Sequence, residues 1–266
     1  MKHYPIGIFD SGIGGLTVAN AIKKVLPNED IIYFGDTEHL PYGEKSAQAI
    51  EDYSEKIIKF LIIKKCKMII IACNSASSVA EKNMTRLQEK ISVLNVIDPI
   101  VEEIATNYAK FNIGVIGTKA TIKSKIYESK LKCICPDINV KSLSTPLLAP
   151  MIEEGFINEE ISSTIITNYL SNNKLGNIDH LILACTHYPL IQNEINNFYK
   201  SNVNIIDSPN IVAKYIEKQL RKDSILNNKK QTQHHFYVSN YTESFEKSAK
   251  FFFKESIKLE EINLFR

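Results

Sequence analysis

The sequence predicts an α/β protein of two pseudo-symmetric lobes, each a mostly parallel sheet flanked by helices. Short runs rich in Ile and Val alternate with amphipathic stretches, a pattern typical of βα units around a parallel sheet. The second half of the chain repeats motifs of the first half. Because 44% of the 266 residues are hydrophobic, the chain has enough apolar side chains to form a full core.

Each predicted strand is a short apolar run between polar turns. In the first half of the chain these runs occupy residues 6–9, 30–34, 68–72 and 93–97. In the second half they occupy residues 112–116, 140–143, 180–184 and 203–206. We expect helices between the strands. One of them begins after Ser46, a residue suited to capping, and repeats Ile50, Tyr53 and Ile57 at helical spacing.

The repeated motifs fall at equivalent places in the two halves. Ile-Gly-Ile-Phe-Asp-Ser at 6–11 is echoed by Ile-Gly-Val-Ile-Gly-Thr at 113–118. Ile-Ala-Cys-Asn-Ser at 71–75 is echoed by Leu-Ala-Cys-Thr-His at 183–187. A duplicated unit of domain size indicates two similar lobes. The C-terminal residues predict a helix at 211–220, a strand at 233–239 and a helix at 245–253, and the pattern alone does not place them.

Composition argues against several classes of protein. The 32 Lys and Arg residues and 30 Asp and Glu residues are spread along the chain, so we expect no nucleic-acid partner. The longest apolar runs, such as 68–73, are far shorter than the roughly 20 residues that cross a bilayer, so we expect no membrane partner. A glycine-rich motif follows the start directly and leaves no room for a signal peptide, and the cysteines number five. Both features favour a cytoplasmic protein without disulfides.

The first motif with chemical meaning is the glycine-rich turn DSGIGG at 10–15. Its glycines let the backbone approach an anionic group beside a helix N-terminus. Its spacing matches neither the dinucleotide fingerprint nor the phosphate P-loop. Taken alone, this motif is compatible with a tight turn and nothing more, and so is the Leu-Pro-Tyr-Gly turn at 40–43.

Two cysteines, Cys73 and Cys185, follow predicted strands in the repeated motifs. Because ligands bind beyond the carboxyl ends of strands in open parallel sheets, we expect both thiols, and the active site, in a cleft between the lobes. Cys73 precedes a helix, whose N-terminal N–H groups predict a lowered thiol pKa. Its neighbours Asn74 and Ser75 are able to bind a carboxylate or an ammonium group. His187 is a candidate proton partner for Cys185.

Two thiols that face one ligand allow two kinds of chemistry. One is a disulfide switch. The other is removal of a proton from one face of a carbon atom and delivery of a proton to the opposite face, since a thiolate is a base and a thiol is an acid. This second chemistry inverts a stereocentre without a cofactor.

Six motifs in order along the chain carry a resemblance to a known family. They are DSGIGGL at 10–16, LPYG at 40–43, ACNSAS at 72–77, GTxxT at 117–121, MIEEG at 151–155 and ACTHYPL at 184–190. With these motifs the chain resembles bacterial glutamate racemases of the cofactor-independent aspartate/glutamate racemase superfamily. The two cysteine motifs at this separation are highly specific together, whereas either one alone is only suggestive.

The resemblance implies a role for each motif residue. Cys73 and Cys185 match the two catalytic acid/base residues. Asp10 matches the carboxylate that assists the first thiol, His187 the imidazole that assists the second, and Glu153 a carboxylate that pairs with the histidine. The residues that match substrate-binding positions are Asp10, Ser11, Tyr42, Gly43, Asn74, Ser75, Thr118, Thr121, Thr186 and His187. No metal and no cofactor are expected.

The resemblance also implies an organisation and a biological role. One lobe is expected to comprise residues 1–97 plus 208–266 and the other residues 98–207, and the protein is expected to be a homodimer. The expected reaction interconverts L- and D-glutamate and supplies D-glutamate for peptidoglycan synthesis. Because the repeated motif at 6–11 begins as early as Ile6, we do not expect the activation by a cell-wall precursor that relatives with an N-terminal extension require.

The sequence leaves three other functions open. An aspartate racemase, or another amino-acid racemase of the superfamily, would differ in its substrate. A two-lobed binding protein or a thiol redox switch would bind a ligand without turnover or depend on a disulfide. A nucleotide-binding flavodoxin-like module is disfavoured because neither phosphate-loop spacing is present.

Overall fold

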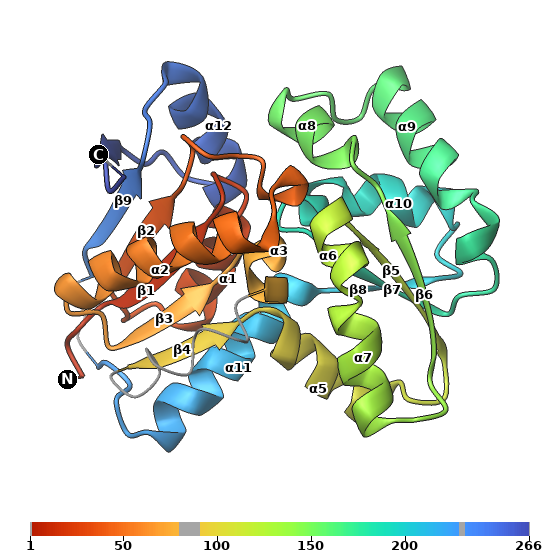
Figure 1. Ribbon diagram of the computed structural model, residues 1–266, viewed down its shortest axis with the longest axis horizontal. Coiled ribbons are helices and arrows are strands. Elements are labelled where there is room, and N and C mark those ends of the chain that lie inside the picture. The colour runs from red at the N-terminus through yellow and green to blue at the C-terminus, as the bar shows by residue number, and fades with distance from the viewer. Residues whose placement is uncertain (1, 80–90, 229–231, 266) are drawn as a thin grey trace.

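Two parallel sheets flanked by helices form the protein (Figure 1). The computed structural model describes residues 2–79, 91–228 and 232–265. Every strand pair in the two sheets is parallel, so the predicted α/β fold class is confirmed. Within the described ranges no helix is both long and apolar enough to span a membrane.

The larger sheet combines strands from both ends of the chain. Its strands are β1 (Ile6–Asp10), β2 (Ile31–Gly35), β3 (Met68–Ile71), β4 (Ser92–Asn95), β9 (His234–Val238) and β10 (Leu259–Glu261). Their spatial order is β10-β9-β2-β1-β3-β4. Strands β9 and β10 of the C-terminal segment therefore extend the sheet that begins with β1, while the expected division of the chain into two lobes stays a prediction.

The smaller sheet is formed from the middle of the chain. Its strands are β5 (Asn112–Gly117), β6 (Asn139–Ser144), β7 (His180–Ala184) and β8 (Asn204–Ile206), in spatial order β6-β5-β7-β8. The repeated motifs occupy matching places, since β1 and β5 are the paired neighbours of β3 and β7 in their respective sheets.

Helices follow most of the strands. They are α1 (Leu16–Val25), α2 (Ala47–Ile63), α3 (Asn74–Val79), α5 (Ile97–Asn107), α6 (Lys119–Ser124), α7 (Ile126–Ile134), α8 (Leu148–Glu153), α9 (Glu160–Leu170), α10 (Gln192–Phe198), α11 (Ser208–Lys222) and α12 (Glu243–Phe253). Short 3-10 turns occur at η1 (Tyr42–Glu44), η2 (Asn173–Leu175) and η3 (Tyr188–Ile191). Ser46 caps α2 as predicted, because its hydroxyl accepts a hydrogen bond from the N–H of Ala49.

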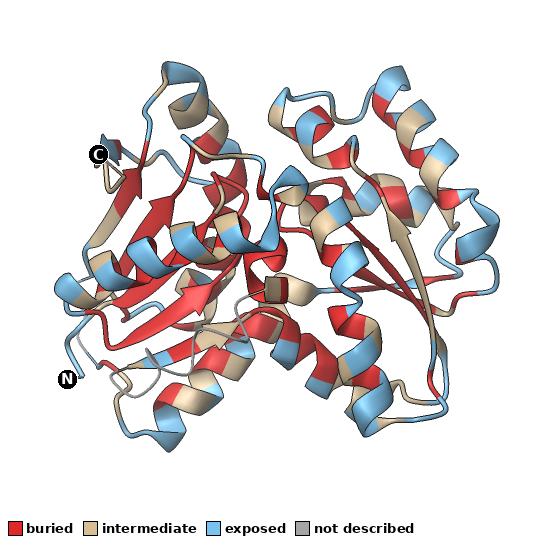
Figure 2. Cartoon of the chain, viewed as in Figure 1, coloured by how far each residue is buried: buried red, intermediate tan, exposed pale blue. Residues whose placement is uncertain are grey.

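Apolar side chains cover both faces of the larger sheet. Ile6 and Ile8 of β1 belong to the core that includes residues of α1, α11 and α12, whereas Phe9 packs with Ile50 and Ile57 of α2. This division follows from the alternation of side chains along a strand. In Figure 2 the central strands β1, β2 and β3 are buried, the edge strands β4 and β10 are partly exposed, and the outer faces of the helices are exposed.

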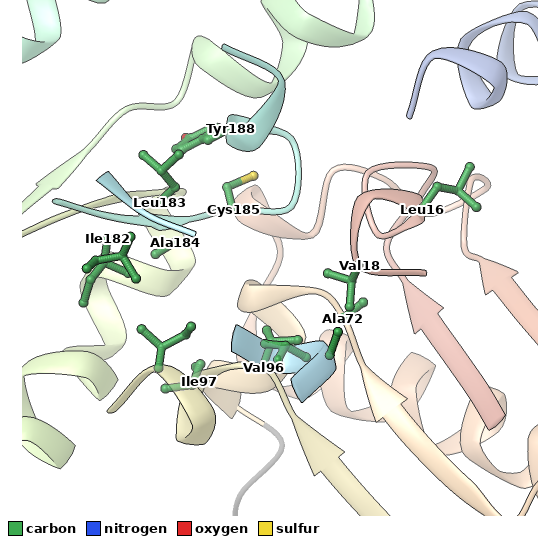
Figure 3. Packing of buried hydrophobic residues seen from close by; sticks show 14 of the residues in the cluster. Leu16, Val18, Ala72, Val96, Ile97, Ile182, Leu183, Ala184, Cys185 and Tyr188 are labelled. Carbon is green, nitrogen blue, oxygen red and sulfur yellow. The ribbon is translucent and has the colours of Figure 1, made fainter. Parts of the chain in front are cut away.

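One core continues from the first lobe into the second. Val18 of α1 and Ala72, which follows β3, belong to the same buried cluster as Ile97 of α5, Leu183 of β7 and Cys185 (Figure 3). Apolar packing therefore joins the two lobes directly behind the ends of their strands. This arrangement places Cys185 at the boundary between core and cleft.

Two details of the strand predictions are wrong. The strand predicted at 93–97 ends at Asn95, because the Asn95 side chain accepts hydrogen bonds from the N–H groups of Ile97 and Asp98 and so starts α5. The edge strand β10 was not predicted. It has three residues, of which only Leu259 is buried, so it lacks the apolar run on which strand prediction depends.

A buried ion pair fixes the start of β3. Lys67 Nζ lies 2.5 Å from Glu29 Oε2, and both side chains are almost fully buried. The same ammonium group donates to the carbonyl groups of Lys2 and Ile225, and Glu29 Oε1 accepts from the N–H of Asn227. The pair thus connects the N-terminal residues, β3 and the segment after α11.

We predict that Glu29→Gln lowers the free energy of unfolding by about 3–5 kcal/mol, because it leaves the Lys67 charge buried without its counter-ion. Urea denaturation followed by circular dichroism measures this loss. Glu55→Gln, which removes the exposed Glu55–Lys59 pair, is the matched control and should leave the midpoint almost unchanged. Equal midpoints for the two variants would contradict this account of the buried pair.

Candidate active site

A cavity of about 260 Å³ lies where strands of both sheets end. It is lined by residues of both lobes, among them Cys73 at the end of β3 and Cys185 at the end of β7. All the predicted site residues line it except Asp10 and Thr121, which lie behind its wall. Four lining residues were not among the predicted site residues: Leu40, Pro41, Ala149 and Pro150. The first two belong to the LPYG motif, and the last two directly precede the MIEEG motif.

The Cys73 thiol lies in an environment that disfavours its ionisation. It is buried, 3.6 Å from the Ser11 hydroxyl, and its sulfur accepts a hydrogen bond from the N–H of Ala76 in α3. Burial, followed by the negative charge of Asp10, raises the pKa of Cys73 to about 12, although these two hydrogen bonds act in the opposite direction. The predicted lowering is therefore wrong, since the helix N-terminus is present but desolvation outweighs it.

Cys185 has an imidazole partner, which Cys73 lacks. Its sulfur lies 3.6 Å from Nδ1 of His187, and Nε2 of the same ring lies 2.8 Å from Oε1 of Glu153 in α8. Burial lowers the pKa of His187, but its hydrogen bonds and charge interactions with Cys185 and Glu153 outweigh burial and raise that pKa well above its usual range. A protonated His187 donates to Cys185 through one nitrogen and to Glu153 through the other.

Asp10 connects the first motif with the second lobe. Its carboxylate is fully buried and accepts hydrogen bonds from the N–H of Gly12 at 3.1 Å and from the hydroxyl of Thr186 at 3.4 Å. Burial raises the pKa of Asp10, although the charge of His187 and the backbone N–H groups of the glycine turn act against this rise. Asp10 therefore lies behind the cavity, within electrostatic reach of both sulfur-bearing turns.

The glycine-rich turn has a packing role. A side chain at Gly14 would come within 2.5 Å of His187 Nδ1 and Thr186 Oγ1, so only glycine allows the second lobe to approach this closely. Thr17, three residues further on, donates a hydrogen bond to the carbonyl oxygen of Thr186 at 2.8 Å. The approach of these glycines to an anion stays a prediction.

Three hydroxyl groups join the lobes at another wall of the cavity. Ser75 Oγ lies 2.8 Å from Thr118 Oγ1, and Thr118 donates to Thr121 at 3.1 Å. Gly43 packs on the Thr118 side chain, where a β-carbon would approach to 2.8 Å. Thr118 thus lines the cavity, whereas Thr121 supports it from behind.

Asp36 holds the turn that carries Tyr42. The Tyr42 hydroxyl donates to Asp36 Oδ2 at 2.6 Å, and Ser239 donates to Asp36 Oδ1 at 2.8 Å. His39 Nδ1 lies 2.8 Å from the same carboxylate. The Tyr42 hydroxyl therefore faces away from the ligand space. Asp36 was not predicted as a functional residue, because it lies outside the six motifs.

Comparison with known proteins decides the family. The family model for Asp/Glu/hydantoin racemases matches residues 16–216 of this chain. The chain belongs to this racemase family. The family membership that the motifs predicted is thereby confirmed.

Within the racemase family, several relatives and solved structures similar to this chain are glutamate racemases. The glutamate racemase of Geobacter metallireducens is 39% identical over 243 residues, which cover 90% of this chain and 89% of that protein. The crystal structure of glutamate racemase from Francisella tularensis in complex with D-glutamate has a TM-score of 0.93 at 37% identity and covers 100% of this chain and 99% of that one. A glutamate racemase isoform from Bacillus anthracis also has a TM-score of 0.93, at 33% identity and 99% coverage of both chains. The aspartate racemase of Picrophilus torridus shares the fold at 23% identity and a TM-score of 0.56.

We predict that Glu153→Gln lowers the pKa of His187, because the variant removes the negative charge that faces Nε2. Since the pKa of His187 is raised in the folded protein, its imidazolium form should persist above the usual range and be lost at a lower pH in the variant. NMR titration of the imidazole resonances measures both midpoints. Glu154→Gln, an exposed neighbour, is the matched control. An unchanged midpoint in Glu153→Gln would show that Glu153 does not raise the pKa of His187.

Proposed function

We propose that this protein is a glutamate racemase, an isomerase that interconverts L- and D-glutamate by cofactor-independent acid/base chemistry. The observation that carries the proposal is the pair of free thiols, Cys73 and Cys185, which reach one cavity from different lobes. Inversion of a stereocentre needs a proton acceptor on one face and a proton donor on the other. The glutamate racemases among the relatives support the choice of substrate.

The reaction from L- to D-glutamate begins at Cys185. Its thiolate removes the α-proton, and the electron pair of the broken C–H bond stays on the α-carbon and spreads into the α-carboxylate. Cys73 then gives the proton of its S–H bond to the opposite face, where the new C–H bond forms. The product is D-glutamate, with a thiol at Cys185 and a thiolate at Cys73. The reverse reaction begins at Cys73.

The unequal surroundings of the two thiols suit this division of roles. The raised pKa of Cys73 keeps a proton available for donation. The raised pKa of His187 keeps an imidazolium beside Cys185, where it stabilises a negative sulfur. Asp10 raises the basicity of Cys73 when the reaction runs in reverse.

The cavity must stabilise a carbanion, because the α-proton of an amino acid is a weak acid. Ser11 and Thr118 contribute hydroxyl groups, and η1 and α3 begin at the cavity, at Tyr42 and Asn74, with backbone N–H groups that lack helical partners. Fixed donors in a site of low water content stabilise developing negative charge better than water does. Ser11, Tyr42, Gly43, Asn74, Ser75, Thr118, Thr186 and His187 are accordingly proposed to hold the substrate, with Asp10 and Thr121 supporting them.

The biological setting is proposed from the family resemblance. D-glutamate is a building block of peptidoglycan, so the enzyme would act in cell-wall synthesis. Its amino-acid substrate is a metabolite of the cytoplasm, which is the proposed location, and a homodimer is the proposed assembly.

Incubation of the purified protein with L-glutamate, without added cofactor, tests the proposal. We predict that the circular dichroism signal of L-glutamate decays to zero, as expected for a racemic mixture, while the signal of L-aspartate decays at least about 100-fold more slowly because binding groups placed for the longer side chain no longer meet the shorter one. A flat trace with L-glutamate would overturn the proposed function. A faster decay with L-aspartate would assign the protein to aspartate racemases.

A further inference from the structure

The Asn74 side chain has two ends with opposite hydrogen-bonding character, and the structure fixes which end faces the ligand. Asn74 is the first residue of α3, is buried, and lines the cavity beside Cys73. Its carbonyl oxygen Oδ1 lies 2.7 Å from the hydroxyl of Tyr127, a residue of α7 in the other lobe. This is the one hydrogen bond that the side-chain amide of Asn74 makes to the residues that the structure describes.

Tyr127 must act as the donor in this hydrogen bond. Its side chain is buried, and burial, followed by the charges of Asp98 and Cys185, raises its pKa, so the phenol keeps its proton. A separation of 2.7 Å is typical of an O–H···O bond and short for an N–H···O bond. If the amide were turned around, two donors would face each other or the buried O–H would lose its acceptor, which costs free energy.

An amide held by its oxygen presents its NH₂ group on the other side. The two ends of a planar amide diverge, so the NH₂ group of Asn74 points away from Tyr127, and its two donors have no hydrogen-bond partner among the described residues. Glutamate carries two carboxylates and one ammonium group. Four carboxylate oxygens need donors, whereas the ammonium group needs acceptors, and Asn74 supplies donors only.

We propose that Tyr127 is a positioning residue that sets the polarity of Asn74, so that Asn74 donates to a carboxylate of the substrate and does not accept from its ammonium group. This inference rests on the proposed function for the identity of the ligand. Asn74 belongs to the first lobe and Tyr127 to the second, so the binding group of one lobe is oriented only when the other lobe is in place.

The Asn74→Asp variant tests the polarity of the side chain. An aspartate keeps the shape of asparagine and an acceptor for Tyr127, but places an anionic oxygen where the NH₂ group was. We predict that the dissociation constant for racemic glutamate, measured by calorimetry, rises at least about 100-fold, and further than in Asn74→Ala, because the new charge repels the carboxylate. Unchanged or tighter binding in Asn74→Asp would show that Asn74 faces the ammonium group and would overturn the inference.

The Tyr127→Phe variant tests the positioning role. It removes the donor that fixes the amide, so we predict that KM for L-glutamate rises about tenfold while kcat stays within about threefold of its original value. Tyr199→Phe is the matched control, since it removes another buried hydroxyl of the same lobe, one without a hydrogen-bond partner among the described residues. In an Asn74→Ala background, Tyr127→Phe should have no further effect on KM.

The outcomes separate the two proposals. If the unmodified protein neither binds nor racemises glutamate, the proposed function fails. If it racemises glutamate but Tyr127→Phe leaves KM unchanged, or changes it equally with and without Asn74, the positioning role alone fails.

Discussion

The approach of the Cys185–His187 turn to the glycine-rich turn is the contact on which the rest of the site depends. Gly14 leaves room for the side chains of Thr186 and His187, and Thr17 holds the Thr186 carbonyl group at 2.8 Å. Without this approach the second lobe would carry Cys185 away from the first. The continuous apolar core behind the strand ends keeps the two turns together, so packing energy maintains the geometry that the chemistry requires.

Close packing at this junction also determines the electrostatics. Cys73, Asp10 and His187 are all shielded from water, so each responds strongly to its immediate partners. Cys73 faces a carboxylate and keeps its proton, whereas Cys185 faces an imidazole that a second carboxylate, Glu153, keeps protonated. Two thiols at equivalent ends of duplicated strands thus have different charged neighbours. The duplication explains why the two thiols occupy equivalent positions, and the different residues around them explain why their surroundings differ.

Much of this arrangement could be predicted from the sequence, because it depends on local patterns. Apolar runs gave the strands, and the repeated Ala-Cys motifs placed both thiols at strand ends, where parallel sheets bind ligands. The direction of the Cys73 pKa shift could not be predicted, since it depends on burial and on Asp10, which is distant in sequence and contributed by another strand. Tyr127 has no motif of its own, and its contact with Asn74 exists only after the lobes assemble. Asp36 likewise accepts a hydrogen bond from Ser239, a residue of the C-terminal segment that is distant from it in sequence.

The central claim is that one thiol serves each face of the α-carbon. Exchange of the α-hydrogen in heavy water, followed by NMR for both enantiomers, tests it most directly in Cys73→Ala and Cys185→Ala. Racemisation should fall at least about 100-fold in both variants, because one acid/base group is lost from each. Cys73→Ala should still exchange the α-hydrogen of L-glutamate slowly without forming D-glutamate, and Cys185→Ala should exchange only that of D-glutamate. Racemisation by Cys73→Ala at nearly the original rate, or equal exchange of both enantiomers by one variant, would contradict the assignment.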